Sequence, residues 1–137
     1  MSQILVVDDS SNITSILEER FSELGYRVLT AQNAYEALEI LAENSVDLVI
    51  TDIVMPGPSG LYLIADIQSN YPRTKVIAIS NGGRQQEDLM YGDRSQEDMK
   101  MYFQKAKEKG AVHCVEKPFK TVELVATVKE VLGESQS

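Results

Sequence analysis

Five polar side chains stand at the ends of short apolar runs in this chain, and their types suit a divalent metal and a phosphoryl group. Asp8 and Asp9 follow the first run and Asp52 follows the third, while Ser80 and Lys117 follow the last two. Short apolar runs that alternate with helical patterns are typical of parallel strands, and ligands sit at the carboxyl ends of such strands. Three carboxylates, a hydroxyl and a lysine are therefore expected to meet at one edge of a sheet.

The carboxylates match the ligands of a magnesium ion. Mg²⁺ prefers near-octahedral oxygen coordination, usually one or two carboxylates together with phosphate oxygens and waters. We expect Asp9 and Asp52 to supply the carboxylates and a main-chain carbonyl just after Asp52 to supply a neutral ligand. Asp8 is expected to act through a water. The sequence therefore predicts Mg²⁺ as the cofactor.

A carboxylate at such a site can attack phosphorus to give an acyl phosphate. The nucleophile and the donor are both anionic, and a metal and a lysine remove that repulsion. Lys117 is the lysine, and the Ser80 hydroxyl can donate to a phosphoryl oxygen. Taken singly, each residue also fits an ordinary role, such as a turn former for Asp52 or a solvated surface position for Lys117. The joint pattern at four strand ends favours the chemical interpretation.

Length and composition indicate one domain with an excess of acidic residues. The 137 residues suffice for one core, and 43% hydrophobic with 25% charged residues is ordinary for a globular protein. The net charge of -8 argues against nucleic acid as a partner, because phosphate binding needs clustered Lys and Arg. A single cysteine, Cys114, and the lack of a signal peptide or a long apolar run predict a cytoplasmic protein with no membrane partner.

Five strands are expected to alternate with five helices in one domain over residues 1–132, with a disordered tail over 133–137. The strands are expected at 4–7, 27–30, 48–52, 76–80 and 112–116. Between them, apolar residues recur at helical spacing. In chain order these are Ile13, Ile16, Leu17, Phe21 and Leu24; Ala37, Leu38 and Leu41; Leu61, Ile64 and Ile67; Met99, Tyr102, Phe103 and Ala106; and Leu124, Val125, Val128 and Leu132.

Cap residues mark several helix starts. Ser10 offers an N-cap for the first helix. Asn33 and Glu36 form a capping-box pattern before the second helix, and Ser95 with Asp98 forms another before the fourth.

Residues 81–94 do not fit the regular alternation. They form a fourteen-residue segment between a strand and a helix, where loops usually run about 2–6 residues. The segment contains Gly82-Gly83 and a small apolar group at Leu89-Met90-Tyr91. We expect it to act as a mobile flap beside the site and as part of a partner surface, and a surface insertion without a role is the alternative.

Four segments together resemble the receiver domain of two-component response regulators. The resemblance is carried by residues 4–9, 47–57, 77–80 and 109–119. It implies a flavodoxin-like, doubly wound α/β fold, with a five-stranded parallel sheet of order 2-1-3-4-5 and five helices on its two faces. It also implies a cis Lys117-Pro118 bond.

The resemblance implies a role for each site residue. Asp52 would accept a phosphoryl group from a sensor histidine kinase or a phosphotransfer protein, and Lys117 and Ser80 would contact the phosphoryl oxygens. The implied metal ligands are Asp8, Asp9, Asp52 and the Val54 carbonyl. The protein would catalyse only its own phosphorylation and dephosphorylation and would signal by switched protein binding. No output domain follows, so the chain resembles a stand-alone regulator of the chemotaxis or phosphorelay type, expected as a monomer or weak dimer.

The chain departs from the family pattern at three places. Cys114 stands where the family usually has Tyr or Phe, Asn81 stands where Ala or Gly is more common, and segment 81–94 has no counterpart in the short family loop. The positions that the resemblance assigns to orienting a hydrolytic water are Val54 and Gly82, and neither side chain can hydrogen-bond water.

Two alternatives stay open on the sequence. One is a Mg²⁺-dependent phosphatase with an aspartyl nucleophile, although such enzymes usually carry a second acid where this chain has Val54. The other is a degenerate receiver that acts as a constitutive interaction module. The intact acid set and Lys117 argue against the second alternative, and Cys114 in place of the aromatic residue keeps it open.

Overall fold

The chain alternates strands and helices from its first described residues to its last. The computed structural model describes residues 2–55, 57, 59–80 and 95–134, and for residues 95–99 it describes the main chain only. Within these residues the elements are β1 (Gln3–Val7), α1 (Ser11–Glu23), β2 (Arg27–Ala31), α2 (Ala34–Glu43), β3 (Leu48–Asp52), α3 (Gly60–Asn70), β4 (Lys75–Ser80), α4 (Ser95–Lys109), β5 (His113–Glu116) and α5 (Thr121–Leu132). The expected alternation is confirmed.

The five described strands form one parallel sheet of order β2-β1-β3-β4-β5, as expected for a flavodoxin-like fold. Val7 at the end of β1 lies opposite Thr51 near the end of β3, and Asp52 lies opposite Ile79 of β4. This register brings the carboxyl ends of β1, β3 and β4 to one edge. The residues that follow these ends are therefore neighbours although they are far apart in the sequence.

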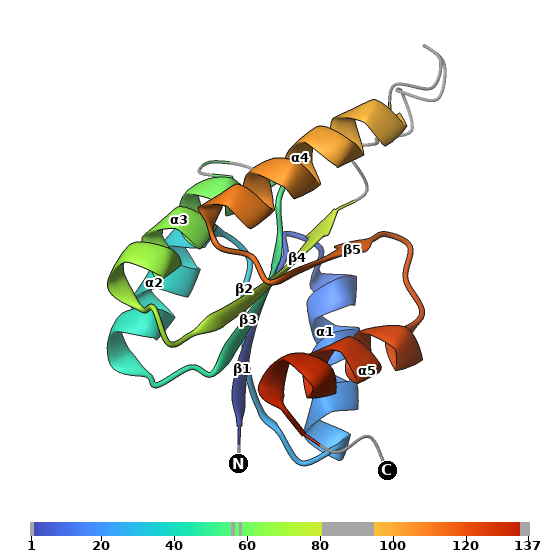
Figure 1. Ribbon diagram of the computed structural model, residues 1–137. Helices are drawn as coiled ribbons and strands as arrows, with labels where there is room; N and C mark the ends of the chain where they lie inside the picture. Colours follow the sequence, from blue (N-terminus) through green and yellow to red (C-terminus); the bar gives the residue numbers. More distant parts are fainter. Residues whose placement is uncertain (1, 56, 58, 81–94, 135–137) are drawn as a thin grey trace.

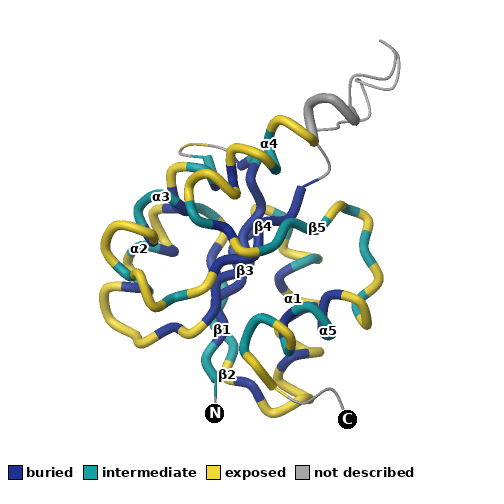
Figure 2. The backbone as a smooth tube through the Cα atoms, viewed as in Figure 1, coloured by how far each residue is buried: buried dark blue, intermediate teal, exposed yellow. Residues whose placement is uncertain are grey.

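The helices cover both faces of the sheet and give it two cores (Figure 1). Helices α2, α3 and α4 pack on one face, where the strands contribute Leu5, Val7, Val49, Val76 and Ala78. Helices α1 and α5 pack on the other face, where the strands contribute Ile4, Val6, Leu48, Ile50, Ile77 and Ile79. The central strands are buried on both sides (Figure 2), which explains why they read as continuous apolar runs rather than alternating ones.

Side-chain caps begin three of the helices. Ser10 Oγ accepts from the Ile13 amide at 3.4 Å, and Ser59 caps α3 in the same way. At α2, Asn33 Oδ1 accepts from the Glu36 amide at 2.9 Å, while Glu36 Oε1 accepts from the amide of Gln32 at 2.8 Å. The predicted capping box at α2 is therefore confirmed, with the glutamate reaching one residue further back than the cap itself.

The residues that α1 buries differ in part from those that the helical spacing of the sequence predicts. Leu17 and Phe21 are buried as expected, but Ile16 is 55% exposed and Leu24 is 37% exposed. Thr14 is buried instead, and its hydroxyl donates to the carbonyl of Ser11 at 3.1 Å. Thr14 lies three and seven residues before the two buried apolar side chains, so it shares their face. Because its hydroxyl bonds the helix itself, a polar residue fits in this core.

Two further details differ from the sequence predictions, and three predictions concern residues or side chains that the structure does not describe. Leu63 is fully buried on α3, although the sequence pattern did not single it out, and β5 begins at His113 rather than at residue 112. The capping box of Ser95 with Asp98, the inward position of Met99 and the flap over 81–94 lie outside the described residues or side chains.

The end of α5 is ordered by specific bonds. Gly133 adopts a left-handed conformation with φ 71° and ends the helix, and the Glu134 amide donates to the Lys129 carbonyl at 2.8 Å. The Tyr26 hydroxyl donates to Glu134 Oε1 at 3.0 Å. The first two residues of the tail that the sequence predicts as disordered thus make bonds with the rest of the fold, and residues 135–137 lie outside the described part.

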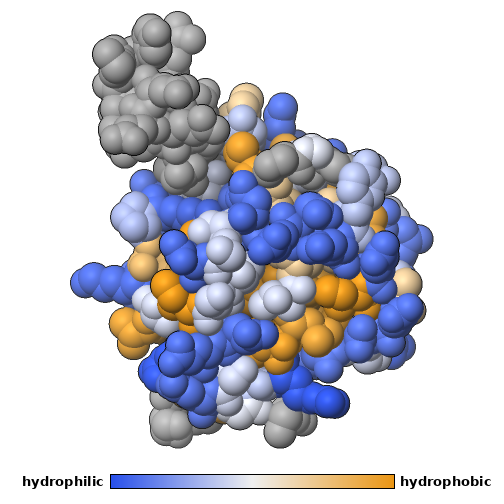
Figure 3. Space-filling view, turned by 180° about the vertical axis from the view of Figure 1, so that it is seen from behind, coloured by the Kyte–Doolittle hydropathy of each residue, from blue (hydrophilic) through white to orange (hydrophobic). Residues whose placement is uncertain are grey.

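On the face seen in Figure 3, hydrophobic side chains show between hydrophilic ones. The large hydrophobic residues exposed among those described are spread over several elements: Ile16, Leu24, Tyr35, Tyr62, Met101, Val112 and Val122. Singly exposed apolar side chains of this kind are normal. None of the described helices is both long and apolar enough to cross a bilayer.

The contact of Tyr26 with Glu134 predicts a pH-dependent contribution to stability. Burial, with the hydrogen bond and the charge of Glu134, raises the pKa of Tyr26 to about 12. An unfolded tyrosine titrates near 10, so this contribution is complete below about pH 10 and is lost as the pH rises through about 12. We expect Tyr26→Phe to cost roughly 1 kcal/mol at pH 8 and progressively less towards pH 12, in urea denaturation.

Tyr35→Phe is the matched control, because Tyr35 is exposed. It should change the unfolding free energy little at any of these pH values. A Tyr26→Phe cost that stays constant from pH 8 to pH 12 would contradict the assignment.

Candidate functional site

Three carboxylates converge at the carboxyl edge of the sheet. Carboxylate oxygens of Asp8, Asp9 and Asp52 all lie within 4.8 Å of one another. Asp8 is fully buried, Asp52 is buried and Asp9 is exposed. The structure thus brings together the three acids that the sequence pattern places at two strand ends. The pairing of β1 with β3 brings Asp52 close to Asp8 and Asp9, although they are far apart in the sequence.

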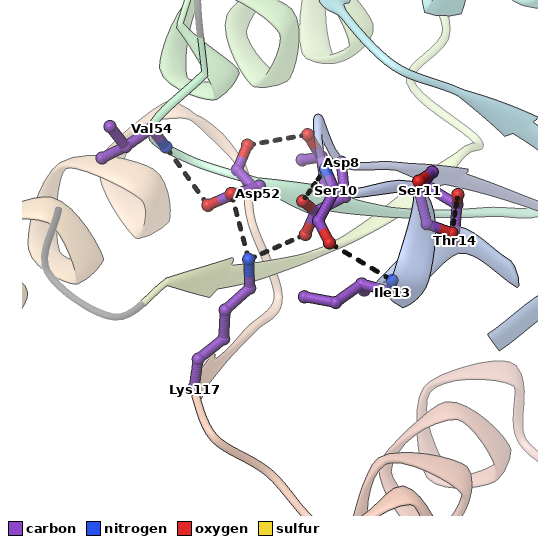
Figure 4. Close-up of polar contacts among 9 residues, drawn as sticks. Asp8, Ser10, Ser11, Ile13, Thr14, Asp52, Val54 and Lys117 are labelled. Atoms are coloured by element: carbon purple, nitrogen blue, oxygen red, sulfur yellow. Dashed lines mark hydrogen bonds and ion pairs between the residues drawn. The ribbon is translucent and has the colours of Figure 1, made fainter. Parts of the chain in front are cut away.

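The Lys117 ammonium lies between two of these carboxylates (Figure 4). Its Nζ donates to Asp8 Oδ2 at 2.8 Å and to Asp52 Oδ2 at 3.1 Å. The lysine side chain is 15% exposed, so water screens these ion pairs only in part. Lys117 is therefore a constituent of the acid cluster and not the solvated surface lysine of the ordinary interpretation.

Burial and charge shift the pKa values of the Asp52 carboxyl and the Lys117 ammonium. Burial, partly offset by the positive charge of Lys117 and assisted by the negative charge of Asp8, raises the pKa of Asp52 to about 6. Burial works to lower the pKa of the Lys117 ammonium, but the hydrogen bond to Asp8 and the charge of Asp52 outweigh it and hold that pKa above its usual value. At neutral pH the site thus holds an ionised, largely desolvated carboxylate beside a charged lysine.

Main-chain groups orient two of the carboxylates. Asp8 Oδ1 accepts from the Ser10 amide at 2.9 Å, and Asp52 Oδ1 accepts from the Val54 amide at 3.3 Å (Figure 4). Each acid therefore uses one oxygen for the backbone of its own loop and the other for Lys117. Both carboxylates are held in place before any ligand arrives.

Ser80 joins the site through the pairing of β4 with its two neighbours. It is fully buried at the end of β4, and its carbonyl accepts from the Lys117 amide at 2.8 Å. The Ile53 amide donates to the Ile79 carbonyl at 3.0 Å, which extends the pairing of β3 with β4 beyond Asp52. The predicted hydroxyl and the predicted lysine are thus connected by their main chains, and both lie at the edge that carries the acids.

Two residues beside Asp52 were missed by the sequence analysis. The Thr51 hydroxyl donates to the Asp52 carbonyl at 2.9 Å. Gly60, the first residue of α3, packs so closely that a Cβ there would overlap the same carbonyl oxygen. A glycine at the start of a helix that follows a Pro-rich loop is a sequence signal for such an approach. No comparable signal in the sequence indicates the hydrogen bond of the Thr51 hydroxyl.

The position that usually carries an aromatic residue is filled by a half-buried thiol. Cys114 Sγ donates to the Phe103 carbonyl of α4 at 3.6 Å. Burial raises the pKa of the Cys114 thiol, against a smaller lowering by Lys107. The thiol therefore acts as a packed group between β5 and α4. The Lys117-Pro118 bond is cis, as the resemblance implies.

Comparison with known proteins identifies the family that the sequence resembles. The response regulator receiver domain family matches residues 4–92. The DNA-binding transcriptional regulator NtrC of Azospirillum brasilense is 34% identical over 132 residues, which cover 96% of this chain and 24% of that protein. The transcriptional regulatory protein CpxR of Klebsiella pneumoniae is 30% identical over 135 residues, covering 98% of this chain and 51% of that protein.

Two solved receiver structures have the same fold. The beryllofluoride-activated NtrC4 receiver domain dimer is 31% identical with a TM-score of 0.78, and the match covers 97% of this chain and 98% of that one. The response regulator TrrA of Thermotoga maritima, solved with Mg²⁺ and beryllofluoride, is 34% identical with a TM-score of 0.71, covering 96% and 99%.

This chain spans about a quarter to about half of the length of curated relatives that it matches. The matches with NtrC and CpxR nonetheless cover 96% and 98% of this chain, and the family model covers residues 4–92. The chain belongs to the receiver domains of two-component response regulators.

Proposed function

We propose that the chain is a phosphorylation-switched signalling domain in which Asp52 accepts a phosphoryl group from a histidine kinase or a phosphotransfer protein. The observation that carries this proposal is the position of the Lys117 ammonium, 3.1 Å from an oxygen of Asp52 and 2.8 Å from one of Asp8, within a cluster of three carboxylates. A carboxylate can act as the nucleophile when adjacent positive charge offsets the repulsion between the two anions.

The transfer requires one bond to form and one to break. An oxygen of Asp52 attacks the donor phosphorus, an Oδ–P bond forms, and the P–N bond of the donor phosphohistidine breaks with its electron pair leaving on the imidazole. Lys117 is placed to contact the transferred phosphoryl oxygens because its Nζ already contacts the attacking carboxylate. Ser80, at the end of the adjacent strand, is the proposed hydroxyl donor to those oxygens. The product is an aspartyl phosphate on β3.

The donor set fits a magnesium ion. Carboxylate oxygens of Asp8, Asp9 and Asp52 within 4.8 Å of one another are hard ligands of the type that Mg²⁺ prefers. The Val54 carbonyl is the proposed neutral ligand, since the Val54 amide already contacts Asp52. When bound, Mg²⁺ supplies charge neutralisation of the phosphoryl oxygens.

The proposed output is protein binding that depends on phosphorylation, with turnover limited to the domain's own phosphoryl group. The relatives NtrC and CpxR are named as transcriptional regulators. With a net charge of -8, we expect the residues of this chain to engage protein rather than nucleic acid. The proposed output is therefore binding to a protein partner that distinguishes the phosphorylated domain from the unphosphorylated one.

The acceptor assignment is tested by chemical phosphorylation. Incubation with acetyl phosphate and Mg²⁺ should add one acid-stable, base-labile phosphoryl group, measured by intact mass. Asp52→Asn should abolish uptake, because the nucleophilic oxygen is lost. Asp66→Asn is the control, since Asp66 lies on α3 and its carboxylate accepts from Asn70 outside the cluster. If Asp52→Asn takes up label at the wild-type rate, the assignment is wrong.

The metal site is tested by thermal melts with and without Mg²⁺. A ligand that binds only the native state at ten times its dissociation constant adds about 1.4 kcal/mol to the free energy of unfolding. Asp9→Asn should lose most of this gain, because it removes a metal ligand while Lys117 keeps both of its ion pairs. An identical midpoint for the wild-type protein at saturating Mg²⁺ and in chelator would count against the site.

The aspartyl phosphate is expected to outlast the timescale of seconds. Hydrolysis needs a water held in line with the Oδ–P bond, and the Val54 side chain cannot hydrogen-bond water. We expect Val54→Gln to shorten the phosphoryl half-life and Val54→Leu to leave it unchanged, when loss of the label is followed after removal of the donor. A wild-type half-life of seconds would contradict this expectation.

A further inference from the structure

Two neighbouring groups contact the main-chain carbonyl of Asp52. The Thr51 hydroxyl donates to it at 2.9 Å in a buried environment. The backbone of Gly60 approaches the same carbonyl, and a Cβ on that residue would overlap the Asp52 oxygen and lie 2.9 Å from the carbonyl carbon. The orientation of the peptide that follows the acceptor is thus defined by a hydroxyl on β3 and by the first residue of α3.

The next peptide is held as well. The Gly60 amide donates to the Ile53 carbonyl at 2.7 Å, and the Ile53 amide donates to the Ile79 carbonyl at 3.0 Å. Ile53 is therefore fixed between α3 and β4. The chain then reaches Val54, whose amide donates to Asp52 Oδ1 at 3.3 Å. The turn that carries the acceptor and the proposed neutral metal ligand depends on these contacts.

The identity of both residues is informative. Thr51 is fully buried in a strand whose other residues before the acceptor are all apolar. Valine has the same shape and would fill the position without burying a hydroxyl, so the hydroxyl is explained by the bond it makes. Gly60 lies inside the first turn of α3, where glycine is less favourable than alanine. Its presence is explained by the carbonyl that occupies the place of a side chain.

We propose that Thr51 and Gly60 are positioning residues for the phosphoryl-transfer site. By holding the Asp52 carbonyl they orient the Asp52 carboxylate towards Lys117 and place the Val54 main chain beside the acid cluster. Neither residue touches the phosphoryl group or the metal. This inference rests on the proposed function and adds to it the residues that set the geometry of the acceptor.

The test compares Thr51→Val, which removes the hydroxyl and keeps the shape, with Thr51→Ser, which keeps the hydroxyl. Mg²⁺ affinity is measured by titration calorimetry, and the rate of phosphorylation by acetyl phosphate is measured at saturating Mg²⁺. We expect Thr51→Val to weaken Mg²⁺ binding and to slow phosphorylation by roughly fivefold each, and Thr51→Ser to stay within about twofold of wild type.

A matched control separates positioning from general stability. The Thr74 hydroxyl donates to the Val46 carbonyl at 2.7 Å where β4 begins, at the opposite edge of the sheet. Thr74→Val should lower the melting temperature while leaving Mg²⁺ affinity and phosphorylation rate unchanged. Gly60→Ala is the second variant, because its Cβ must displace the Asp52 peptide or the start of α3. It should lower both the Mg²⁺ affinity and the phosphorylation rate, and a thermal melt checks that the variant is folded.

The outcomes distinguish the two proposals. If the wild-type protein takes up no phosphoryl group from acetyl phosphate, the proposed function fails and the positioning roles fail with it. If the wild type is phosphorylated and Thr51→Val lowers only the melting temperature, as Thr74→Val does, the residues are structural and the positioning proposal alone is overturned. Loss of activity in Thr51→Val with retention in Thr51→Ser supports the proposal.

Discussion

The contact of one lysine with two buried aspartates is the constraint on which the rest of the site depends. Three carboxylates within 4.8 Å repel one another strongly in a partly desolvated setting. Lys117 offsets that repulsion by contacting Asp8 and Asp52 together. Its ammonium reaches both acids because β5 pairs with β4 and because the Lys117 amide is bonded to the Ser80 carbonyl. Without this sheet order the acids would lack the cation that makes their proximity tolerable.

The sheet also holds the acids rigidly through main-chain bonds that continue past the strand ends. The Asp8 amide donates to the Ala31 carbonyl at 3.1 Å, which prolongs the pairing of β1 with β2. The Ile53 amide does the same between β3 and β4. A side chain attached to a paired backbone loses little further freedom when it binds a ligand. The acid cluster is thus an extension of the sheet, in which two cores of apolar side chains keep the strands in register.

Local patterns in the sequence were enough to predict the carboxyl ends of β1, β3, β4 and β5 and the capping box of α2, because each depends on residues close in the chain. The meeting of Asp8, Asp9, Asp52 and Lys117 follows from these strand ends and from the order of the sheet, and the chemical roles of these residues stay a prediction. Features that depend on tertiary contact were missed. The bond between Tyr26 and Glu134 joins residues 108 positions apart. Gly60 meets Asp52 only when α3 packs against the end of β3. The exposure of Ile16 follows from where α1 meets the sheet, and helical spacing alone does not define that rotation.

The environment of Asp52 shows how the proposed transfer would reach the rest of the fold. Burial raises the pKa of Asp52 to about 6, and the adjacent positive charge of Lys117 partly offsets the effect of that burial. An aspartyl phosphate carries more negative charge at the same place and offers Lys117 new acceptor oxygens. Any change in the position of Lys117 acts on β4 and β5 together, because its amide is bonded to Ser80. Cys114 of β5 donates to the Phe103 carbonyl of α4, so the thiol links the strand that precedes Lys117 to that helix, at a position where the sequence departs from the family pattern.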